Sequence, residues 1–312
     1  MEKIEKNRYN GIRAGLWYTI GNMLIKGIPF LTLPLFTRLM STSDFGIYNT
    51  YISYESVLGI ILGFGISGTV KIAKTDFKDN FEQYVSSVFR LLLFCGGILL
   101  LIVNIAGIFL DVEKSWLNPF ILNLLVLQSI STAIYGVMSC KYVIEGDYLR
   151  NLSIAFVMTG VNVGSSLFLC YTLMSANRAD ARILGTCMGA VLTASYILLS
   201  QRRKAKLVQN READRYALKL GLPLIPHQLS VSLLSQCDRI MIQAMVGNSQ
   251  AGIYGLAVNI TMVISVILSS VDNAWTPWFY RLLREKEYGE LKKKNNLLVV
   301  LFMILTSGSL LV

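Results

Sequence analysis

Long apolar runs recur along the whole chain and are separated by short polar stretches. A helix that crosses a bilayer needs about 20 mostly apolar residues. Nine segments approach that length, so we expect an all-α polytopic membrane protein with about nine transmembrane helices. The segments are 14–38, 45–70, 91–110, 117–140, 151–174, 183–200, 218–246, 251–279 and one that begins near 295.

The longest polar stretch, Gln201–Arg215, divides these segments into six before it and three after it. We expect an N-terminal lobe of six helices over residues 1–202. A cytoplasmic linker and a partial second lobe, helices seven to nine, are expected over 203–312. The final residue, Val312, falls inside the ninth helix, which predicts one and a half lobes of a longer two-lobe protein.

The basic residues predict an orientation, because Lys and Arg concentrate in cytoplasmic loops. When alternate loops are assigned to opposite sides, 23 of the 29 Lys and Arg fall on the side of the N-terminus. Five fall on the other side, and Lys26 lies within a span. The asymmetry predicts a cytoplasmic N-terminus in a bacterial cytoplasmic membrane.

Composition excludes several classes of protein. Only 15% of the residues are charged, against about 25% in soluble proteins. The net charge of +10 would suggest nucleic acid in a soluble chain, but here the basic residues lie in loops, so no nucleic-acid partner is expected. The five cysteines form no C-x-x-C pair and the chain has one histidine, so neither a metal site nor a cofactor is expected.

Two segments of the chain resemble each other. Ser43–Tyr48 opens the second predicted helix and Ser249–Tyr254 opens the eighth, and both end in Gly-Ile-Tyr. The helix before each segment carries two prolines in its first half. This match predicts two repeats of the same orientation, related by an axis along the membrane normal. Proline bends or loosens a helix, so the expected hinges are Pro29, Pro34, Pro223 and Pro226.

Ionisable residues within spans usually face a cavity or a partner. Lys26 lies about 12 residues into the first predicted helix, or ~18 Å at 1.5 Å per residue, which is near mid-membrane. Arg239 lies next to Asp238, and such a pair is either a structural lock between helices or leaves the arginine for a binding role. Glu55 and Asp238 lie at similar depths, so Glu55 is expected within reach of Arg239. Arg38 and Arg90 lie near span ends, where snorkelling anchors are common. Asp272 and His227 complete this set.

Several motifs resemble those of one transporter family. The matching stretches are Leu33–Leu39 with Asp44–Tyr48, Gly221–Pro226, Ser230–Leu234, Cys237–Ile242, Ala251–Ala257 and Asn273–Tyr280. They resemble the Wzx-type polysaccharide transporters, the flippases of the multidrug/oligosaccharidyl-lipid/polysaccharide (MOP) exporter superfamily. The resemblance covers essentially the whole chain and implies two helical bundles around a central cavity.

The resemblance also implies a substrate. Flippases of this kind move an undecaprenyl-diphosphate-linked oligosaccharide outward for capsule, O-antigen or exopolysaccharide. A polysaccharide polymerase and a chain-length regulator are then expected partners, besides the bilayer. Cavity cations would bind the diphosphate or sugar, for which we single out Lys26, Arg239, Arg90 and Arg38. Coupling to H⁺ or Na⁺ would use acidic or titratable groups, namely Glu55, Asp238, Asp272 and His227.

Three alternatives remain at this point. Cation-coupled efflux of small molecules would use the same fold but favours acidic cavity residues. A membrane glycosyltransferase, acyltransferase or polymerase needs an acid/base or nucleophile arrangement, and the sequence offers none, so we do not expect an enzyme. A non-functional fragment is also compatible with the length.

Overall fold

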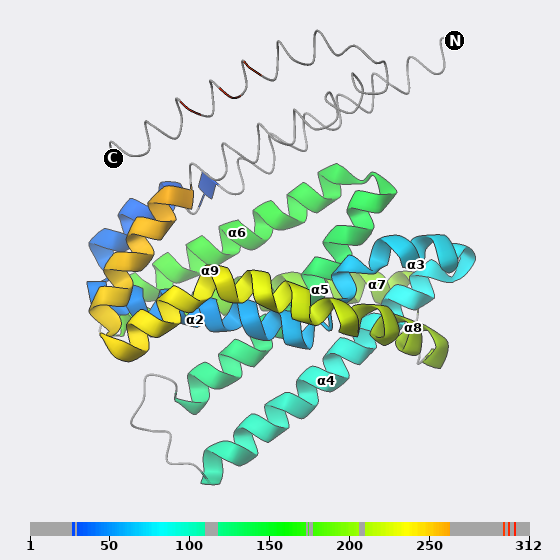
Figure 1. Cartoon of the computed structure of the whole chain (residues 1–312), viewed down its shortest axis with the longest axis horizontal. Coiled ribbons are helices and arrows are strands. Elements are labelled where there is room, and N and C mark those ends of the chain that lie inside the picture. Colours follow the sequence, from blue (N-terminus) through cyan, green and yellow to red (C-terminus); the bar gives the residue numbers. More distant parts are fainter. Residues whose placement is uncertain are drawn as a thin grey trace. The chain divides into compact units, whose positions relative to one another are not determined.

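The computed structural model describes residues 27–28, 30–109, 118–172, 174, 177–205 and 210–262, with 296, 299 and 303 (Figure 1). The chain divides into two compact units, Pro34–Gly255 and Met1–Leu33 with Leu256–Val312. The regular elements of the described residues are all helices. The expected all-α class is therefore confirmed. The repeat boundary predicted at 202/203 is a different division and stays a prediction.

The larger unit holds the elements that carry the functional argument. A helix over Phe30–Leu39 precedes them and helical residues 248–262 follow. The elements are α2 (Thr42–Leu62), η1 (Ile66–Gly68), α3 (Val70–Asp76), η2 (Lys78–Asn80), α4 (Phe81–Phe109), α5 (Pro119–Glu145), α6 (Tyr148–Tyr171), α7 (Arg178–Lys204), α8 (Arg211–Gly221), η4 (Leu222–Leu224) and α9 (Ile225–Met245).

Four helices within the described ranges are long and apolar enough to cross a membrane: Phe81–Gly107, Pro119–Glu145, Tyr148–Tyr171 and Arg178–Lys204. They correspond to the third to sixth predicted spans. The first, eighth and ninth predicted spans lie largely outside the described residues. The second and seventh correspond to α2 and α9, which are helices of 21 residues.

The second predicted span is too long at its C-terminal end. It was expected to reach Val70, whereas α2 ends at Leu62 and a turn leads into η1. In this turn Phe64 and Gly65 have φ values of 49° and 63°. Left-handed backbone is easy for glycine and ends helices. The apolar composition continues through this turn, so hydropathy alone does not reveal it.

The ends of α2 and α5 follow capping rules, and their capping residues can be recognised in the sequence. Ser41 caps α2: its hydroxyl accepts from the Asp44 N–H at 3.1 Å, and the Asp44 carboxylate accepts from the Ser41 N–H at 3.0 Å. This reciprocal pair is a capping box. Asn118 caps α5, with Pro119 as its first residue, and Gly146 ends that helix at φ 74°.

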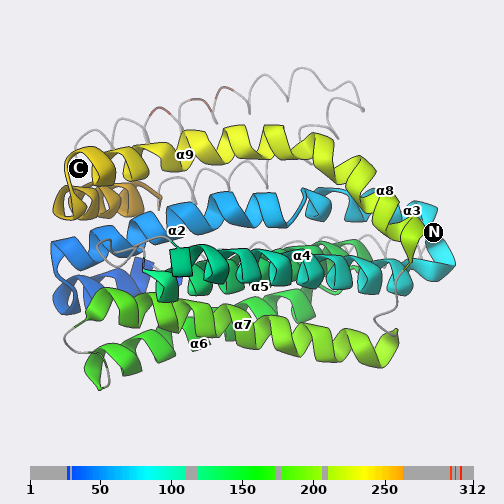
Figure 2. The ribbon, with the colours of Figure 1, turned by 90° about the horizontal axis from the view of Figure 1, so that it is seen from below.

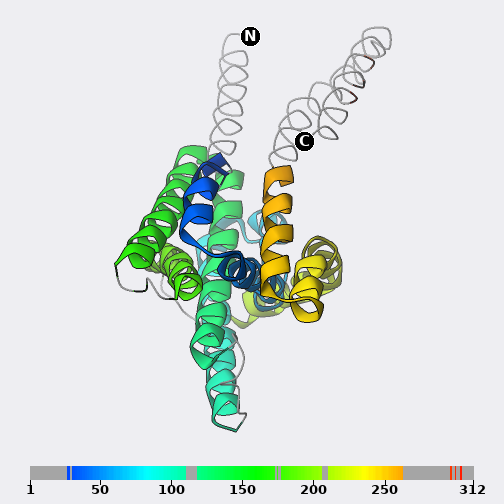
Figure 3. The same cartoon turned by 90° about the vertical axis from the view of Figure 1, so that its left-hand side faces the viewer.

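The interior of the larger unit is packed where α4, α5 and α7 meet. Fully buried side chains from all three helices include Tyr84, Phe89, Ile134, Met138 and Ile197. Figure 2 shows α9 and α2 running side by side, and Figure 3 views the same unit from one end. Helix α2 packs against this bundle, and α9 packs against α2.

The internal sequence match has a geometric counterpart within the larger unit. A Cβ on Gly46 would overlap the Asn248 carbonyl oxygen, and a Cβ on Gly252 would overlap the Thr42 carbonyl oxygen. Thr42 and Gly46 occupy the positions in the first matching segment that Asn248 and Gly252 occupy in the second. Such reciprocal contacts arise when two equivalent segments meet across a two-fold axis. The two glycines permit this close backbone approach.

Candidate functional site

Small polar side chains line the contact between α2 and α9. The Ser56 and Ser232 hydroxyls are 3.1 Å apart, and the Ser53 hydroxyl donates to Gln236 Oε1 at 3.0 Å. We call this contact the polar seam, and define it by its members on the two helices. They are Asn49, Thr50, Ser53 and Ser56 of α2, with Ser232, Gln236 and Arg239 of α9.

The seam has an antiparallel register that places its remaining members. Each turn toward the N-terminus of α2 pairs with one turn toward the C-terminus of α9, as the Ser56–Ser232 and Ser53–Gln236 contacts show. One further turn brings Arg239 level with Asn49 and Thr50. A buried arginine of α9 is therefore level with two buried polar residues of α2.

Arg239 is the most unusual member of the seam. Its residue is 4% exposed. Nη1 donates to Gln236 Oε1 at 3.3 Å, while Nε and Nη2 have no partner among the described residues. Asn49 Nδ2 and Thr50 Oγ1 are also buried without a partner there. Unpaired buried donors are costly, so the free N–H groups of Arg239 are the ones at this level of the seam that can donate to a bound acceptor.

Asp238, the neighbour of Arg239, has a separate partner. Its carboxylate accepts a hydrogen bond from the Tyr254 hydroxyl at 2.8 Å. Residues at i and i+1 project from a helix about 100° apart and do not face each other. Asp238 therefore ties α9 to helical residues 248–255, and the cation of Arg239 is left without that counter-ion.

Glu55 is the second buried charge that the sequence singled out. It is 8% exposed, and its Oε1 has no hydrogen-bond partner in the part of the chain that the structure describes. Thr132, Tyr51 and Cys187 lie near its carboxyl group. Glu55 thus faces α5 and α7. The ion pairs between described residues do not join it to Arg239.

The other predicted site residues fall in varied places. Arg90 is bound by Asp214 of α8 at 2.6 Å, and its Nε is buried without a partner among the described residues. Arg38 and His227 are exposed. Lys26, Pro29 and Asp272 lie outside the described residues. Within the described ranges, no group of three or more His, Cys, Asp or Glu residues is arranged to hold a metal ion.

Of the predicted hinges, Pro34 lies inside the Phe30–Leu39 helix. Pro223 lies in η4, and Pro226 lies in the first turn of α9. A proline in the first turn removes no intrahelical hydrogen bond. The break in the seventh predicted span is therefore the η4 segment, rather than a bend within the body of α9.

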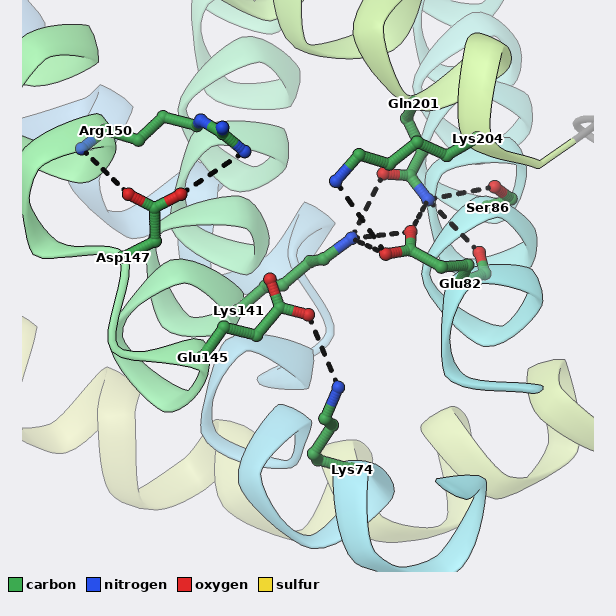
Figure 4. A network of polar contacts seen from close by, with 9 residues as sticks. All are labelled: Lys74, Glu82, Ser86, Lys141, Glu145, Asp147, Arg150, Gln201 and Lys204. Atoms are coloured by element: carbon green, nitrogen blue, oxygen red, sulfur yellow. Dashed lines mark hydrogen bonds and ion pairs between the residues drawn. The ribbon is translucent and has the colours of Figure 1, made fainter. Parts of the chain in front are cut away.

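Sequence reasoning missed a buried lysine. Lys141 was counted as a loop cation, whereas it lies within α5 and is fully buried. Its Nζ bonds both carboxylate oxygens of Glu82 at 2.6 Å, and Gln201 Nε2 donates to the same carboxylate at 2.6 Å (Figure 4). We call Glu82, Lys141 and Gln201 the inner knot. It joins α4, α5 and α7, and the apolar Tyr142, Val143 and Ile144 after Lys141 were the available signal.

Weaker ion pairs surround the inner knot. Lys74 pairs with Glu145, and Arg150 with Asp147, each at 3.3 Å, and these side chains are partly exposed (Figure 4). Exposed pairs contribute about 0–1 kcal/mol each. The buried Lys141 is therefore the charge whose loss matters for the fold at this end of the bundle.

A second missed cation lies at the opposite end of α7. Arg182 is buried, and its guanidinium lies 3.6 Å from the centroid of the Phe36 ring and 5.0 Å from that of Tyr48. Guanidinium groups stack favourably on aromatic faces. The assignment of Arg182 to a loop from charge counting hid this contact, which ties α7 to α2 and to the C-terminal part of the Phe30–Leu39 helix.

Comparison with known proteins identifies the family. A family model described as "Polysaccharide biosynthesis protein" matches residues 12–283. The chain belongs to this family. Two Haemophilus influenzae proteins, one from the Lsg locus and one a membrane protein, are each 22% identical to the chain over 86% and 89% of its length. The chain spans 66% of the length of each relative.

The fold has solved counterparts. A crystal structure of a MATE protein in complex with MaD3S matches with a TM-score of 0.58 and 17% identity, over 90% of this chain and 67% of that one. This identity carries the fold alone. The polysaccharide biosynthesis family and this MATE-like fold are those of transporters rather than enzymes. The chain is thus a multi-pass membrane protein with a transporter fold.

Proposed function

We propose that the chain is the transport unit, or part of it, of a flippase for a polyprenyl-diphosphate-linked oligosaccharide. The observation that carries this proposal is Arg239, a buried guanidinium with two nitrogens, Nε and Nη2, that lack partners among the described residues, at the level of Asn49 and Thr50. Diphosphates and sugar hydroxyls are rich in acceptors, and arginine binds phosphate oxygens in bidentate geometry. Membership of a polysaccharide biosynthesis family supports the same substrate class.

The polar seam supports alternating access. It is held by hydroxyl and amide contacts, and a typical hydrogen bond of this kind contributes only about 0.5–1.5 kcal/mol. Such a contact opens and closes at low cost. We propose Pro34, Pro223 and Pro226, with Pro29 outside the described residues, as the points where the neighbouring helices bend.

The other proposed substrate ligands take second place to Arg239. Lys26, at the predicted mid-membrane depth, is the expected second cation for the diphosphate. Arg38 is exposed at the end of its helix, which suits a transient contact with headgroups. Arg90 is already neutralised by Asp214 at 2.6 Å, so we propose that it anchors α8 first and contacts substrate only if that pair opens.

We further propose that transport is coupled to H⁺ or Na⁺ through Glu55. A buried carboxyl with a free oxygen accepts either a proton or a small cation, and hydroxyl groups such as that of Thr132 are suitable co-ligands. Asp238, Asp272 and His227 remain secondary candidates, since Asp238 is bonded to Tyr254 and His227 is exposed.

The remaining assignments follow from the proposed role. We propose a bacterial cytoplasmic membrane with a cytoplasmic N-terminus, and lobes over 1–202 and 203–312. A polysaccharide polymerase and a chain-length regulator are the expected partners. The glycan is proposed to belong to a capsule, an O-antigen or an exopolysaccharide.

One other function has a specific observation in its favour. The MATE fold and the buried Glu55 suit cation-coupled efflux of small amphipathic cations. Such cargo would be repelled by the unpaired guanidinium of Arg239 unless an anion neutralised it. A rise in resistance to cationic dyes on expression would favour efflux over flipping.

An experiment in cells tests the proposed function. In the full-length gene, Arg239→Ala is expected to cause accumulation of lipid-linked repeat units on the inner side of the membrane, with Arg239→Lys intermediate. The matched control is Arg203→Gln, which removes an exposed cation at the end of α7 and should leave export unchanged. Normal export by Arg239→Ala, at wild-type protein level, would exclude Arg239 from substrate binding.

A further inference from the structure

One face of helix α8 packs against the rest of the larger unit. Ala213 and Ala217 of α8 are fully buried. The Asp214 carboxylate bonds Arg90 at 2.6 Å and the Ser87 hydroxyl at 2.7 Å, both on α4. The helix thus presents a defined opposite face.

That opposite face is basic. Arg211, Arg215 and Lys219 are exposed and spaced by four residues, which places them in one row along a helix. Glu212 is the exposed acidic residue of α8. Asp214 does not offset the row, because Arg90 already neutralises it. We call Arg211, Glu212, Arg215 and Lys219 the basic face.

The basic face lies close to the end of a helix that is long and apolar enough to cross a membrane. Figures 1 and 2 show α8 beside α3 at one end of the larger unit. The spanning helix α7 ends in Arg202, Arg203 and Lys204, which are exposed. Leu222, directly after α8, is 48% exposed. A helix with one cationic face and apolar side chains at its edge is suited to the zone between headgroups and acyl chains.

We propose that the basic face of α8 binds the phosphate headgroups of anionic phospholipids in the bilayer that surrounds the spans. The cations attract phosphodiesters along a row, and the attachment of α8 to α4 keeps the row at the level where the spans end. Bound lipid thereby holds α8 against the bundle, next to η4, the break before α9. This inference is independent of the substrate that the transporter moves.

Anionic lipids are favoured over other anionic partners by the position of the face. The row belongs to a helix attached to a membrane-spanning bundle, where phospholipid headgroups are the most abundant anions. Three cations in a single row, with an acid among them, also make a small footprint for nucleic acid, whose binding uses more phosphate contacts.

Thermal unfolding of the purified full chain in mixed micelles tests the proposal. Phosphatidylglycerol, compared with phosphatidylcholine, is expected to raise the Tm by about 2–4 °C, as a ligand of the folded state does. Replacing all three cations (Arg211→Gln, Arg215→Gln and Lys219→Gln) should abolish this rise. Glu212→Gln should increase it, and Arg150→Gln, which removes an exposed cation of α6, should leave it unchanged.

Two results would overturn the proposal. One is a full phosphatidylglycerol effect in the triple variant, provided that its Tm in phosphatidylcholine matches the wild type. The other is an equal rise with inorganic phosphate at the same phosphorus concentration, which would make the face a site for free anions. If the triple variant does not fold, Glu212→Gln decides alone, because it must strengthen the lipid effect.

Discussion

The most informative residues of this chain are charges that lie where charge is expensive. Arg239, Glu55 and Lys141 are all buried, yet they differ in what surrounds them. Lys141 is matched by Glu82 at 2.6 Å, whereas Arg239 and Glu55 each keep polar atoms that lack partners among the described residues. A matched buried charge serves the fold, and an unmatched one is available to a ligand.

Lys141 is expected to be a stability residue. Lys141→Met leaves the Glu82 carboxylate without its main cation, and the expected loss of unfolding free energy is about 1–3 kcal/mol, since Glu82 is partly open to water. The measurement is the denaturation midpoint of the purified protein. Lys204→Met is the matched control, because Lys204 approaches Glu82 only to 3.9 Å. A Lys141→Met protein as stable as the wild type would show that the inner knot has no role in stability.

Two glycines where the matching segments approach each other make a second residue-scale prediction. Gly46→Ala or Gly252→Ala forces a Cβ into a backbone carbonyl, so the segments must separate, with an expected cost of about 1–3 kcal/mol. Gly97→Ala and Gly160→Ala are the controls, since nothing lies within 4 Å of an added Cβ at either position. Equal stability of all four variants would contradict the close approach.

Whether a buried charged residue can be predicted from the sequence depends on where it lies in an apolar run and on what it contacts. Glu55 and Arg239 were found because a charge inside an apolar run is visible without a structure. Lys141 and Arg182 were missed because each lies at the end of an apolar run, where a cation usually belongs to a loop. Their partners, Glu82 and Phe36, are distant in sequence and no local pattern connects them.

At the scale of elements, the apolar runs predicted α5, α6 and α7 within a few residues, since apolar length is what a membrane span requires. They predicted α4 from Leu91, ten residues later than its start at Phe81, because Glu82 and Arg90 interrupt the apolar pattern. They also predicted no break within the second span, where the turn at Phe64–Gly65 is itself apolar. Tertiary contacts, and not hydropathy, determine those two boundaries.

The attachment of α8 gives a prediction that depends on pH. The Tyr216 hydroxyl donates to Asp76, and burial together with this carboxylate raises the pKa of Tyr216 to about 12, against about 10 in an unfolded chain. A raised pKa means that the neutral phenol stabilises the fold below pH 10. This stabilisation is lost as the pH rises from 10 to 12.

A comparison of the wild type with Tyr216→Phe isolates this effect. The wild type should be the more stable protein at pH 8, and the difference should shrink between pH 10 and 12. Denaturation midpoints of both proteins across this range are the measurement. A difference in stability that stays constant to pH 12 would show that the contact with Asp76 does not raise the pKa of Tyr216.

The polar seam gives a prediction about movement of elements. The Ser56 and Ser232 hydroxyls are 3.1 Å apart, so Ser56→Cys with Ser232→Cys places two thiols within reach of a disulfide. If the seam opens during transport, oxidation should stop export and a reductant should restore it. Each single cysteine variant is the control for reaction with native thiols. Undiminished export by the fully cross-linked protein would show that the seam stays closed throughout the cycle.

At the scale of the whole molecule, the family and the helical fold followed from the sequence, because its motifs and apolar runs extend through most of the chain. The proposed substrate-binding group did not follow, since it requires knowing that Arg239 is level with Asn49 and Thr50 while Asp238 is bonded to Tyr254. That knowledge comes from the register of α9 against α2 and from a hydrogen bond between α9 and the helix that follows it, and neither can be read from composition.

We propose above that this chain moves a lipid-linked oligosaccharide by means of Arg239. The most direct measurement is flipping in vesicles that contain the purified full-length protein and an undecaprenyl-diphosphate oligosaccharide, read as the fraction of glycan exposed to an external lectin or glycosidase. We expect exposure of the glycan that depends on the protein. Arg239→Ala should reduce it roughly tenfold or more, as loss of a charged hydrogen-bonding group worth at least ~1.4 kcal/mol would. Arg203→Gln should leave it unchanged. Equal exposure with Arg239→Ala and wild type, or none with either while a cationic dye is transported, would contradict the proposal.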